Sequence, residues 1–465
     1  MPRPGGTPAD IRAAAGLFKE GRLDEAAQIA QRLLAADARH FLALHLLATI
    51  AARQSRWEEA VQLATRALEI VPADVEALCN RGAALRMLHR FEDALRDYDR
   101  ALAVAPASAV ARNNRGVALA ALNRHEEALR EFDAALEARP GYPQAHYGRG
   151  ISRLMLGDLR GGWADSEWRW SGGENAGAPR SFAIPQFTEE DWGRCRRLAL
   201  WREQGIGDQL LFSTLLPELE SRGIPFVLEA DERLLPALRR VHPDWNLVAA
   251  PAPDSAFAGC DRHLPIGSLP RLLRPERGSF PESTRALLAA DPARTAAYRS
   301  QIAPGGETAV GISWRSFQPP SRSYYERRKN APLEAFLPLA ALPSVRLVDL
   351  QYGDTAAERQ AFAAAGGKLL FDEGLDRFRD LDGLLALIAA CDVVVSTSNV
   401  TAHLAGCLGK RTLLVYPAAN PAFHYWVPDA RGRSYWHPCV EIVTDESADT
   451  WPALMELVAQ RLQAA

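Results

Sequence analysis

The chain has 465 residues, enough for about two to four domains of the usual size. Charges nearly balance, with 54 Lys and Arg against 57 Asp and Glu, so the formal net charge of -3 excludes the strong basic field typical of nucleic-acid-binding proteins. The six cysteines form no C-x-x-C pair, which excludes the usual spacing of a zinc site or a dense disulfide framework.

The apolar segments are too short for a membrane protein. Residues 1–8 lead directly into an amphipathic pattern and contain no apolar signal core. The most apolar run, residues 384–395, is short and contains Asp392, so it cannot span a bilayer. We therefore expect a cytoplasmic protein without a membrane span.

The first third of the chain repeats with a period of 34 residues. The recurring positions are Pro72, Pro106 and Pro140, Gly82, Gly116 and Gly150, and Ala26, Ala60, Ala94 and Ala128. Small residues are expected where two helices cross closely, and proline is expected where a helix ends. The period and these positions resemble the tetratricopeptide repeat. We expect an α-solenoid of about five repeats over residues 1–171, with degenerate first and last units.

A solenoid of this kind has a concave groove that could hold an extended peptide. Asn80 and Asn114 occupy equivalent positions of two repeats. They are similar to the asparagine ladder of repeat-bearing protein O-glycosyltransferases, which implies a protein acceptor in the groove. The alternative is that they only cap or solvate it, because Leu46 and Gly148 occupy the flanking equivalent positions. Self-association of the solenoid into a homo-oligomer also stays open.

After a linker at residues 172–195, short β-prone runs alternate with helix-like stretches. The expected strands are Leu198–Trp201, 226–229, 309–314, 345–350, Val393–Ser396 and 412–416. This alternation predicts parallel sheets covered by helices. We expect two Rossmann-like α/β lobes, at residues 196–303 and 304–465, with the crossing between them in residues 292–306.

Three motifs resemble a known enzyme family. Residues 201–208 (WREQGIGD) and 394–406 (VVSTSNVTAHLAG) are similar to the first strand–loop and the donor loop of heptosyltransferase-type glycosyltransferases. Residues 162–170, with Trp163 and Trp168-Arg169-Trp170, resemble the joint of bacterial proteins that fuse tetratricopeptide repeats to such a domain. The resemblance implies the two-lobed GT-B fold, a nucleotide-sugar co-substrate and no further cofactor.

Asp208 is the candidate general base. Gly205 and Gly207 predict a tight turn that places its carboxylate at the carboxyl edge of a sheet. Transfer to a hydroxyl needs such a proton acceptor, and the resemblance implies this role for Asp208. Alternatively, Asp208 caps a helix at residues 209–219. The expected acceptor loop comprises Glu203, Gln204, Gly205 and Gly207, with Glu203 as the second candidate base.

The second candidate site is the loop that contains Thr397, Ser398 and Asn399 and opens a helix with Thr401 and His403. Amides at a helix N-terminus favour anions, so a donor phosphate fits there, with His403 as a hydrogen-bond donor. The family usually has an acidic residue near the start of this loop, where this chain has Thr397-Ser398. The alternative is hydroxyl capping, with His403 packed in the helix.

A third candidate site follows another strand and is rich in cations. Its expected donor contacts are Ser313, Trp314, Arg315 and Lys329, and Arg322, Arg327 and Arg328 lie in the same loop. Cations there would stabilise the leaving phosphate without a metal. The alternative is a solvated charged surface.

Three further motifs have weaker functional signals. Gln351 and Tyr352 follow a strand and are candidate nucleotide contacts, and Tyr435-Trp436-His437-Pro438 resembles the Trp-Tyr-Pro turn of related proteins; a structural role is favoured for both. Asp380 and Asp382 have the Asp-x-Asp spacing of metal-dependent transferases, but they precede a helix, so we expect capping and no metal.

Together these features predict a metal-independent glycosyltransferase. It would transfer a sugar from a nucleotide donor to Ser or Thr hydroxyls of a protein recruited by the arm, and the resemblance implies flagellin as an acceptor. Two alternatives stay open: transfer to a lipid-linked or surface glycan, and an adaptor with an inactive transferase domain.

Overall fold

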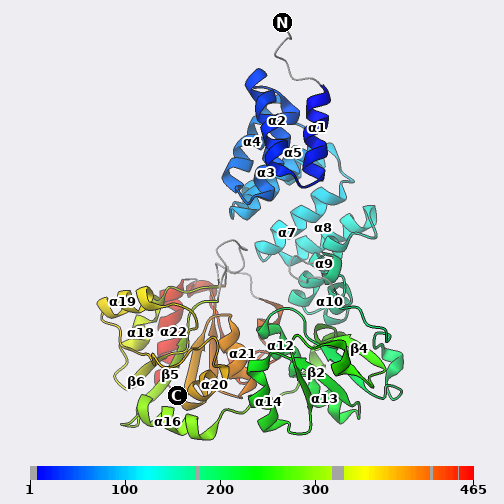
Figure 1. Cartoon of the computed structure of the whole chain (residues 1–465). Coiled ribbons are helices and arrows are strands. Elements are labelled where there is room, and N and C mark those ends of the chain that lie inside the picture. Colours follow the sequence, from blue (N-terminus) through cyan, green and yellow to red (C-terminus); the bar gives the residue numbers. More distant parts are fainter. Residues whose placement is uncertain (1–7, 173–178, 317–328, 419–422, 449, 465) are drawn as a thin grey trace. The chain divides into compact units, whose positions relative to one another are not determined.

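The computed structural model describes residues 8–172, 179–316, 329–418, 423–448 and 450–464 (Figure 1). The chain divides into two compact units, of which the first ends at Ser152 and the second begins at Arg153. None of the helices in these ranges is long and apolar enough to cross a membrane. The fold is therefore an α-helical unit followed by an α/β unit.

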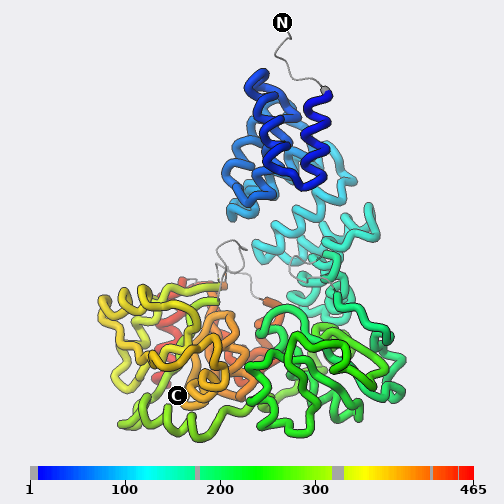
Figure 2. The backbone as a smooth tube through the Cα atoms, viewed as in Figure 1, coloured from blue at the N-terminus to red at the C-terminus, as the bar shows by residue number. Residues whose placement is uncertain are grey.

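The first unit consists of helix pairs stacked one after another (Figure 2). The helices are α1 (Pro8–Lys19), α2 (Leu23–Ala36), α3 (Phe41–Arg53), α4 (Trp57–Ile70), α5 (Val75–Met87), α6 (Phe91–Val104), α7 (Ala109–Ala121), α8 (His125–Ala138) and α9 (Pro143–Leu156), the last of which continues into the second unit. His40, Asp74 and Ser108 cap α3, α5 and α7 through their side chains, each accepting from a backbone N–H three residues later.

The turn inside each helix pair contains one residue with a left-handed backbone. These residues recur every 34 positions, at Gly21, Ser55, His89, Asn123 and Gly157, with φ between 59° and 87°. Only two of the five are glycines, so the pattern is hidden in the sequence. The turn geometry thus repeats more regularly than the residue types that adopt it.

Glycine permits the close helix crossings that the sequence predicts. A Cβ on Gly82 would lie 2.6 Å from the Tyr98 ring, and a Cβ on Gly116 would lie 2.8 Å from the Phe132 ring. On its other side the Phe132 ring meets Gly148, where a Cβ would lie 2.6 Å away. The fully buried Phe132 ring therefore lies between two helices that each carry a glycine. It has no room to move away from either helix if a side chain is added there.

The second unit begins with α10 (Leu159–Ser166) and α11 (Arg169–Gly172), which precede a four-stranded parallel sheet of order β3-β2-β1-β4. We call this sheet and its helices the first lobe. Its elements are β1 (Leu198–Trp201), α12 (Ile206–Ser213), α13 (Leu216–Ser221), β2 (Phe226–Ala230), α14 (Leu235–Val241), β3 (Asn246–Ala249), β4 (Arg262–Pro265) and α15 (Leu269–Leu273).

Two features of the first lobe differ from the sequence analysis. Strands β3 and β4 were not expected, because β3 is a half-exposed edge strand and β4 contains Arg262, His263 and a proline. The helix expected at residues 209–219 begins earlier, at Ile206, and ends at Ser213. Helix α13 then starts at Leu216, and the missing N–H of Pro217 in its first turn cannot continue the previous helix.

The second lobe carries a six-stranded parallel sheet of order β10-β9-β8-β5-β6-β7. Its elements are α16 (Pro292–Ile302), β5 (Thr308–Ser313), α18 (Leu337–Ala340), β6 (Val345–Asp349), α19 (Ala356–Ala364), β7 (Leu369–Leu370), α20 (Leu381–Ala390), β8 (Val393–Ser396), α21 (Val400–Cys407), β9 (Thr412–Val415), β10 (Val440–Val443) and α22 (Trp451–Gln463). The crossing expected in residues 292–306 forms α16, which packs against α20.

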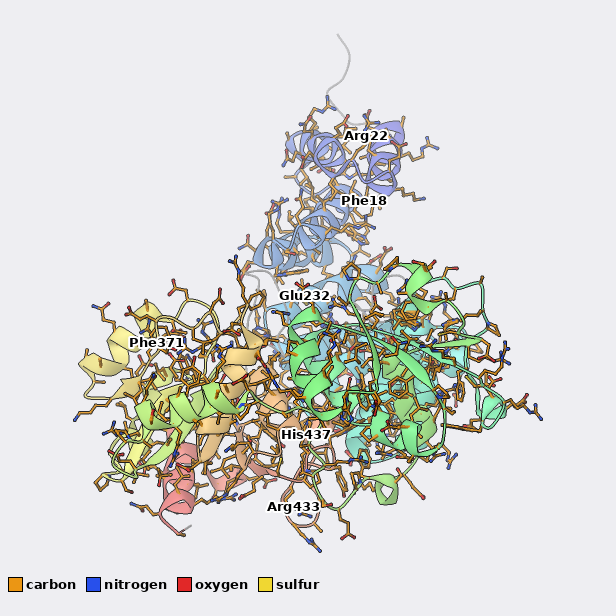
Figure 3. The ribbon with its side chains drawn as sticks, turned by 60° about the horizontal axis from the view of Figure 1, so that its bottom comes forward. Phe18, Arg22, Glu232, Phe371, Arg433 and His437 are labelled. Carbon is orange, nitrogen blue, oxygen red and sulfur yellow. The ribbon has the colours of Figure 1, made fainter. Side chains whose placement is uncertain are left out.

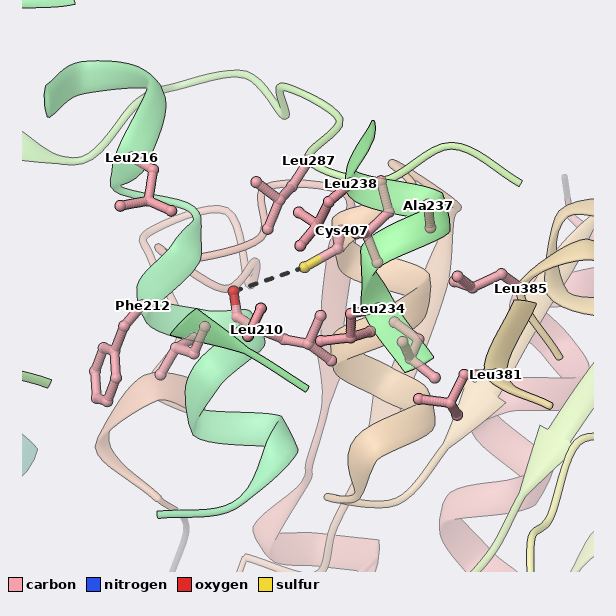
Figure 4. Packing of buried hydrophobic residues seen from close by; sticks show 14 of the residues in the cluster. Leu210, Phe212, Leu216, Leu234, Ala237, Leu238, Leu287, Leu381, Leu385 and Cys407 are labelled. Atoms are coloured by element: carbon pink, nitrogen blue, oxygen red, sulfur yellow. Dashed lines mark hydrogen bonds between the residues drawn. The ribbon is translucent and has the colours of Figure 1, made fainter. Parts of the chain in front are cut away.

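One hydrophobic core contains residues of both lobes. Figure 4 shows Leu210 and Leu234 of the first lobe beside Cys407 of the second, whose Sγ lies 3.9 Å from the Leu210 carbonyl oxygen. A continuous core of this kind fixes the spacing between the two sheets, because separating them would expose buried apolar surface.

The joint segment holds the loop that precedes α12. Glu203 is buried, and its carboxylate receives hydrogen bonds from Arg169 Nε at 2.6 Å, Arg169 Nη2 at 2.8 Å and the Gly267 N–H at 2.8 Å. Trp163 donates through Nε1 to the Arg274 carbonyl at 2.8 Å. The tryptophan and arginine of the joint motif therefore anchor α10 and α11 to the first lobe.

We predict that Gly116→Ala destabilises the first unit by about 1–3 kcal/mol, because the new methyl group overpacks the trapped Phe132 ring. Hydrogen exchange of the α7 and α8 amides should become faster. Gly16→Ala is the matched control, since a Cβ there meets nothing within 4 Å, and it should leave exchange in its own helix unchanged or slower. Equal behaviour of the two variants would contradict the packing argument.

We also predict that Glu203→Gln lowers the stability of the second unit by about 1.5–3 kcal/mol, because the buried Arg169 then loses its charged hydrogen bonds to Glu203 and keeps only Glu167 as a carboxylate partner. Thermal unfolding monitored by calorimetry measures the loss. The control is Asp254→Asn, which breaks an exposed pair with Arg180 and should cost less than about 1 kcal/mol. A small effect of Glu203→Gln would show that the pair does not anchor the loop.

Candidate functional site

A cavity of about 300 Å³ lies within the second unit, and residues of both lobes line it. Its lining residues follow the carboxyl ends of β1, β2, β5, β6, β7, β8 and β9. In open parallel sheets, this edge is where ligands usually bind. The expected site residues that line the cavity are Gly205, Gly207, Asp208, Lys329, Tyr352, Ser398, Asn399 and His403.

Asp208 is the third residue of α12 and lies in the cavity wall. Its Oδ2 accepts a hydrogen bond from the Gly205 N–H at 3.3 Å, so the capping contact exists alongside the exposure to the cavity. Burial raises the pKa of Asp208 to about 6; the Gly205 N–H opposes this shift, and the negative charge of Glu203 adds to it. A carboxyl group with this pKa can accept a proton near neutral pH.

Gly207 brings the two lobes close together at this point. A Cβ on Gly207 would lie 3.3 Å from Cδ2 and 3.8 Å from Nε2 of His403, so the imidazole edge rests against the glycine. His403 is buried, and its ring stacks on Trp426 with a centroid distance of 4.7 Å. Burial lowers the pKa of His403 well below its usual value, and the ring is therefore neutral at pH 7.

The start of α21 forms the opposite wall. Asn399 caps the helix, with Oδ1 accepting from the Thr401 N–H at 2.9 Å, and Ser398 accepts from Trp426 Nε1 at 3.0 Å. The Thr401 hydroxyl is buried without a hydrogen-bond partner. Capping by Asn399 and anion binding are compatible here, because the side chain satisfies only one of the first amides of the helix.

Ser313 and Gln351 are turned into the second lobe and do not line the cavity. The Gln351 Oε1 accepts from the Ser313 hydroxyl at 3.1 Å and from the Trp314 and Arg315 N–H groups at 2.9 Å each. Asn399 Nδ2 donates to Ser313 Oγ at 2.9 Å. This buried network connects the ends of β5 and β6 with the cap of α21, so it shapes the wall behind the cavity.

The cations of the third candidate site separate into two groups. Arg315 pairs with Glu358 at 3.0 Å, and Trp314 Nε1 donates to the same carboxylate at 3.1 Å, so both face α19. Lys329 lines the cavity, and its Nζ lies 5.2 Å from the centroid of the Phe423 ring. The other expected cations, Arg322, Arg327 and Arg328, lie outside the described residues.

Several residues of the cavity wall were not expected from the sequence. Arg233, Arg377, Phe378 and Tyr425 come from loops that the sheet order brings to the same edge. Arg377 is 5% exposed, and its Nε and Nη1 donate to backbone carbonyls, whereas its buried Nη2 has no partner. Arg233 holds the Phe378 carbonyl at 2.7 Å. No sequence motif identifies these arginines as site residues, because isolated charged residues are common in loops of all kinds.

Glu203 and Gln204 of the expected acceptor loop do not line the cavity. Glu203 is engaged by Arg169, and Gln204 is exposed with φ at 57°. Thr397 and Thr401 are also buried behind the wall. Among the described residues, no group of three His, Cys, Asp or Glu side chains could hold a metal ion. The charged side chains that line the cavity, within the described ranges, are Asp208 and the cations Arg233, Lys329 and Arg377.

The Asp-x-Asp pair is structural. Asp380 caps α20 by accepting from the Gly383 N–H at 2.8 Å, and it also pairs with Arg294 at 2.6 Å. Asp382 pairs with Arg240 of the first lobe at 2.5 Å. Both carboxylates therefore have guanidinium partners at the lobe surface.

In the first unit, the two asparagines of the expected groove have different surroundings. Asn80 Nδ2 lies 3.0 Å from His45 Nε2 and 3.3 Å from the Thr49 hydroxyl, so it bridges α5 to α3. Asn114 accepts from the Asn113 amide at 3.3 Å. Both side chains are half-buried on the first helix of their pair.

The tetratricopeptide-repeat family model matches residues 12–75, 79–143 and 126–160. Among solved structures, the chain is similar to a thermophilic tetratricopeptide-repeat protein of Thermus thermophilus, with 20% identity and a TM-score of 0.32 over 35% of this chain and 90% of that one. A repeat protein of Parabacteroides merdae is 25% identical, with a TM-score of 0.31 over 35% of this chain and 65% of that one.

Protein FlbA of Caulobacter vibrioides is 31% identical over 331 residues, which cover 67% of this chain and 53% of that protein. The chain thus spans about half the length of this relative. Because the first unit ends at Ser152, a match of this length extends into the unit that carries the two sheets. The family model confirms the predicted repeats: residues 12–160 carry tetratricopeptide repeats.

Proposed function

We propose that the chain is a metal-independent glycosyltransferase of the GT-B type. It transfers a sugar from a nucleotide donor to Ser or Thr hydroxyls of a protein that the repeat unit recruits. The observation that carries this proposal is the placement of Asp208, a carboxyl group with a pKa near neutrality, in one cavity with Lys329 and the N-terminus of α21.

The cavity has the electrostatic character that a nucleotide sugar requires. In the part of the chain that the structure describes, three cationic side chains and one carboxylate line the cavity, and the helices α12 and α21 begin at its wall. Helix N-termini and cations stabilise phosphate oxygens, and they do so more strongly where water is excluded. In the proposed reaction, the bond between the anomeric carbon and the donor phosphate oxygen breaks, and the released negative charge stays on that phosphate beside Lys329.

Asp208 supplies the complementary step. As the acceptor hydroxyl oxygen bonds to the anomeric carbon, its proton moves to the Asp208 carboxylate. Because the folded-state pKa is raised to about 6, the carboxylate form is present above that pH and is lost as the pH falls below it. The capping contact with Gly205 holds the group at the start of α12, so that its position is fixed before a ligand binds.

The repeat unit supports a protein as the acceptor. Tetratricopeptide repeats build extended surfaces that hold peptide segments. The Asn80 amide nitrogen contacts His45 and Thr49, and the structure shows no partner contact for its Oδ1, which is left to accept a backbone N–H. A flexible peptide could bring its Ser and Thr hydroxyls to a separate catalytic unit.

We predict that Asp208→Asn lowers the rate of nucleotide release from the donor by about 10²–10⁴-fold, because water or acceptor loses its proton acceptor. The assay incubates the full chain with UDP-, GDP-, ADP-, dTDP- and CMP-sugars and measures the released nucleotide. Asn can still accept from the Gly205 N–H and carries no charge that must be desolvated, so the melting temperature should not fall.

The control is Asp254→Asn, which removes an exposed carboxylate of the same lobe and should retain the wild-type rate. The wild-type rate should decline as the pH falls below about 6, and Asp208→Asn should lose this pH dependence. Unchanged turnover of Asp208→Asn would remove Asp208 from the mechanism.

A further inference from the structure

His437, which is labelled in Figure 3, does not line the cavity but contacts His403, which does. Its Nε2 is 3.4 Å from Nδ1 of His403, and both rings are buried. The Cδ2–Nε2 edge of His403 is the one that rests against Gly207 at the cavity. His403 thus has one ring nitrogen toward His437 and the other toward the ligand space.

The turn that carries His437 is held firmly against α21. A Cβ on Gly406 would lie 2.6 Å from the His437 Cγ, so the ring packs directly on the helix backbone one turn after His403. Ser434 Oγ accepts from the His437 N–H at 3.3 Å and donates to the Tyr425 carbonyl at 3.2 Å. The hydrogen bond to Ser434 therefore fixes the His437 backbone, and the contact with Gly406 fixes the position of its ring.

Both imidazoles are uncharged near pH 7, because burial lowers the pKa of His437 to about 4 and that of His403 further below its usual value. A neutral imidazole carries one N–H, so a hydrogen bond between His403 Nδ1 and His437 Nε2 has two arrangements. In one, His403 donates to His437 and presents an acceptor to the cavity. In the other, His437 donates to His403, and His403 presents its Nε2–H to the cavity.

The charge of the cavity favours the second arrangement. Arg233, Lys329 and Arg377 line the space together with Asp208 and the N-termini of two helices, and this excess of positive charge favours an anion whose oxygens accept hydrogen bonds. An acceptor nitrogen beside that anion would be repelled, whereas an N–H would be attracted.

We propose that His437 is a positioning residue that keeps the His403 proton on Nε2, so that His403 donates a hydrogen bond to an anionic oxygen of the donor. The role as a donor contact rests on the function proposed above. His437 itself does not touch the ligand; it acts by fixing the tautomer of the residue that does.

Nitrogen NMR spectra of the full chain with ¹⁵N-labelled histidine test this without any nucleotide, in the presence of excess inorganic pyrophosphate as the anion in the cavity. The His403 signals are assigned by their loss in His403→Gln. We expect the His403 proton on Nε2 in the wild type and in His437→Gln, whose amide can still donate to Nδ1. In His437→Phe, which has a ring of similar size without a donor, we expect a mixture of the two tautomers.

Calorimetry with UDP, GDP, ADP, dTDP and CDP gives the second readout. The tightest of these should bind about three- to tenfold more weakly to His437→Phe, in inverse proportion to the fraction of molecules that keep the proton on His403 Nε2. Binding to His437→Gln should stay within about twofold of wild type. The matched control is His242→Phe, which replaces another buried histidine; its ring stacks on Trp245 and does not line the cavity. It should alter neither readout.

A wild-type His403 protonated on Nδ1 would overturn the proposal, and so would a His437→Phe spectrum identical to wild type. Absence of binding by every nucleotide would instead remove the proposed function. The tautomer spectra would still decide whether His437 sets the proton of His403, so the two failures are distinguishable.

Discussion

The architecture of the site depends on the close packing of α12 against α21. Gly207 allows the approach, since any side chain there would meet the His403 ring, and the shared core around Leu210 and Cys407 holds the two helices at this distance. The two helices start at the carboxyl ends of β1 and β8, strands of different sheets. Their N-termini consequently open into one cavity, although about 190 residues separate them in the chain.

This geometry also determines the electrostatics of the cavity. Among the described residues, helix N-termini and three cations raise the local potential, and Asp208 lies among them as the one lining carboxylate. The pKa of Asp208 rises because the loss of contact with bulk water destabilises its charged form more than the positive charge of Lys329 stabilises it. Burial also keeps His403 neutral, so an uncharged imidazole lines the cavity together with the Asp208 carboxyl group.

The sequence was informative wherever local rules decide the structure. The 34-residue period predicted the helix pairs, because only glycine fits against Tyr98 and Phe132, and the position before α20 predicted the capping by Asp380. The sequence could not predict that the Gln351 side chain points into the second lobe and accepts hydrogen bonds from the backbone after β5. The direction of a side chain at a strand end depends on tertiary packing. Arg377 was missed for a related reason: its loop reaches the cavity only because of the order of the strands in the second sheet.

Calorimetric binding of nucleotides to the full chain, with Lys329→Ala for comparison, tests the central claim most directly. The account predicts that one member of a panel of UDP, GDP, ADP, dTDP, CDP and CMP binds, and that Lys329→Ala weakens this binding by about tenfold or more through loss of a charge-assisted hydrogen bond. If no nucleotide binds, or if Lys329→Ala binds as tightly as the wild type, the cavity is not a donor site and the transferase proposal is wrong.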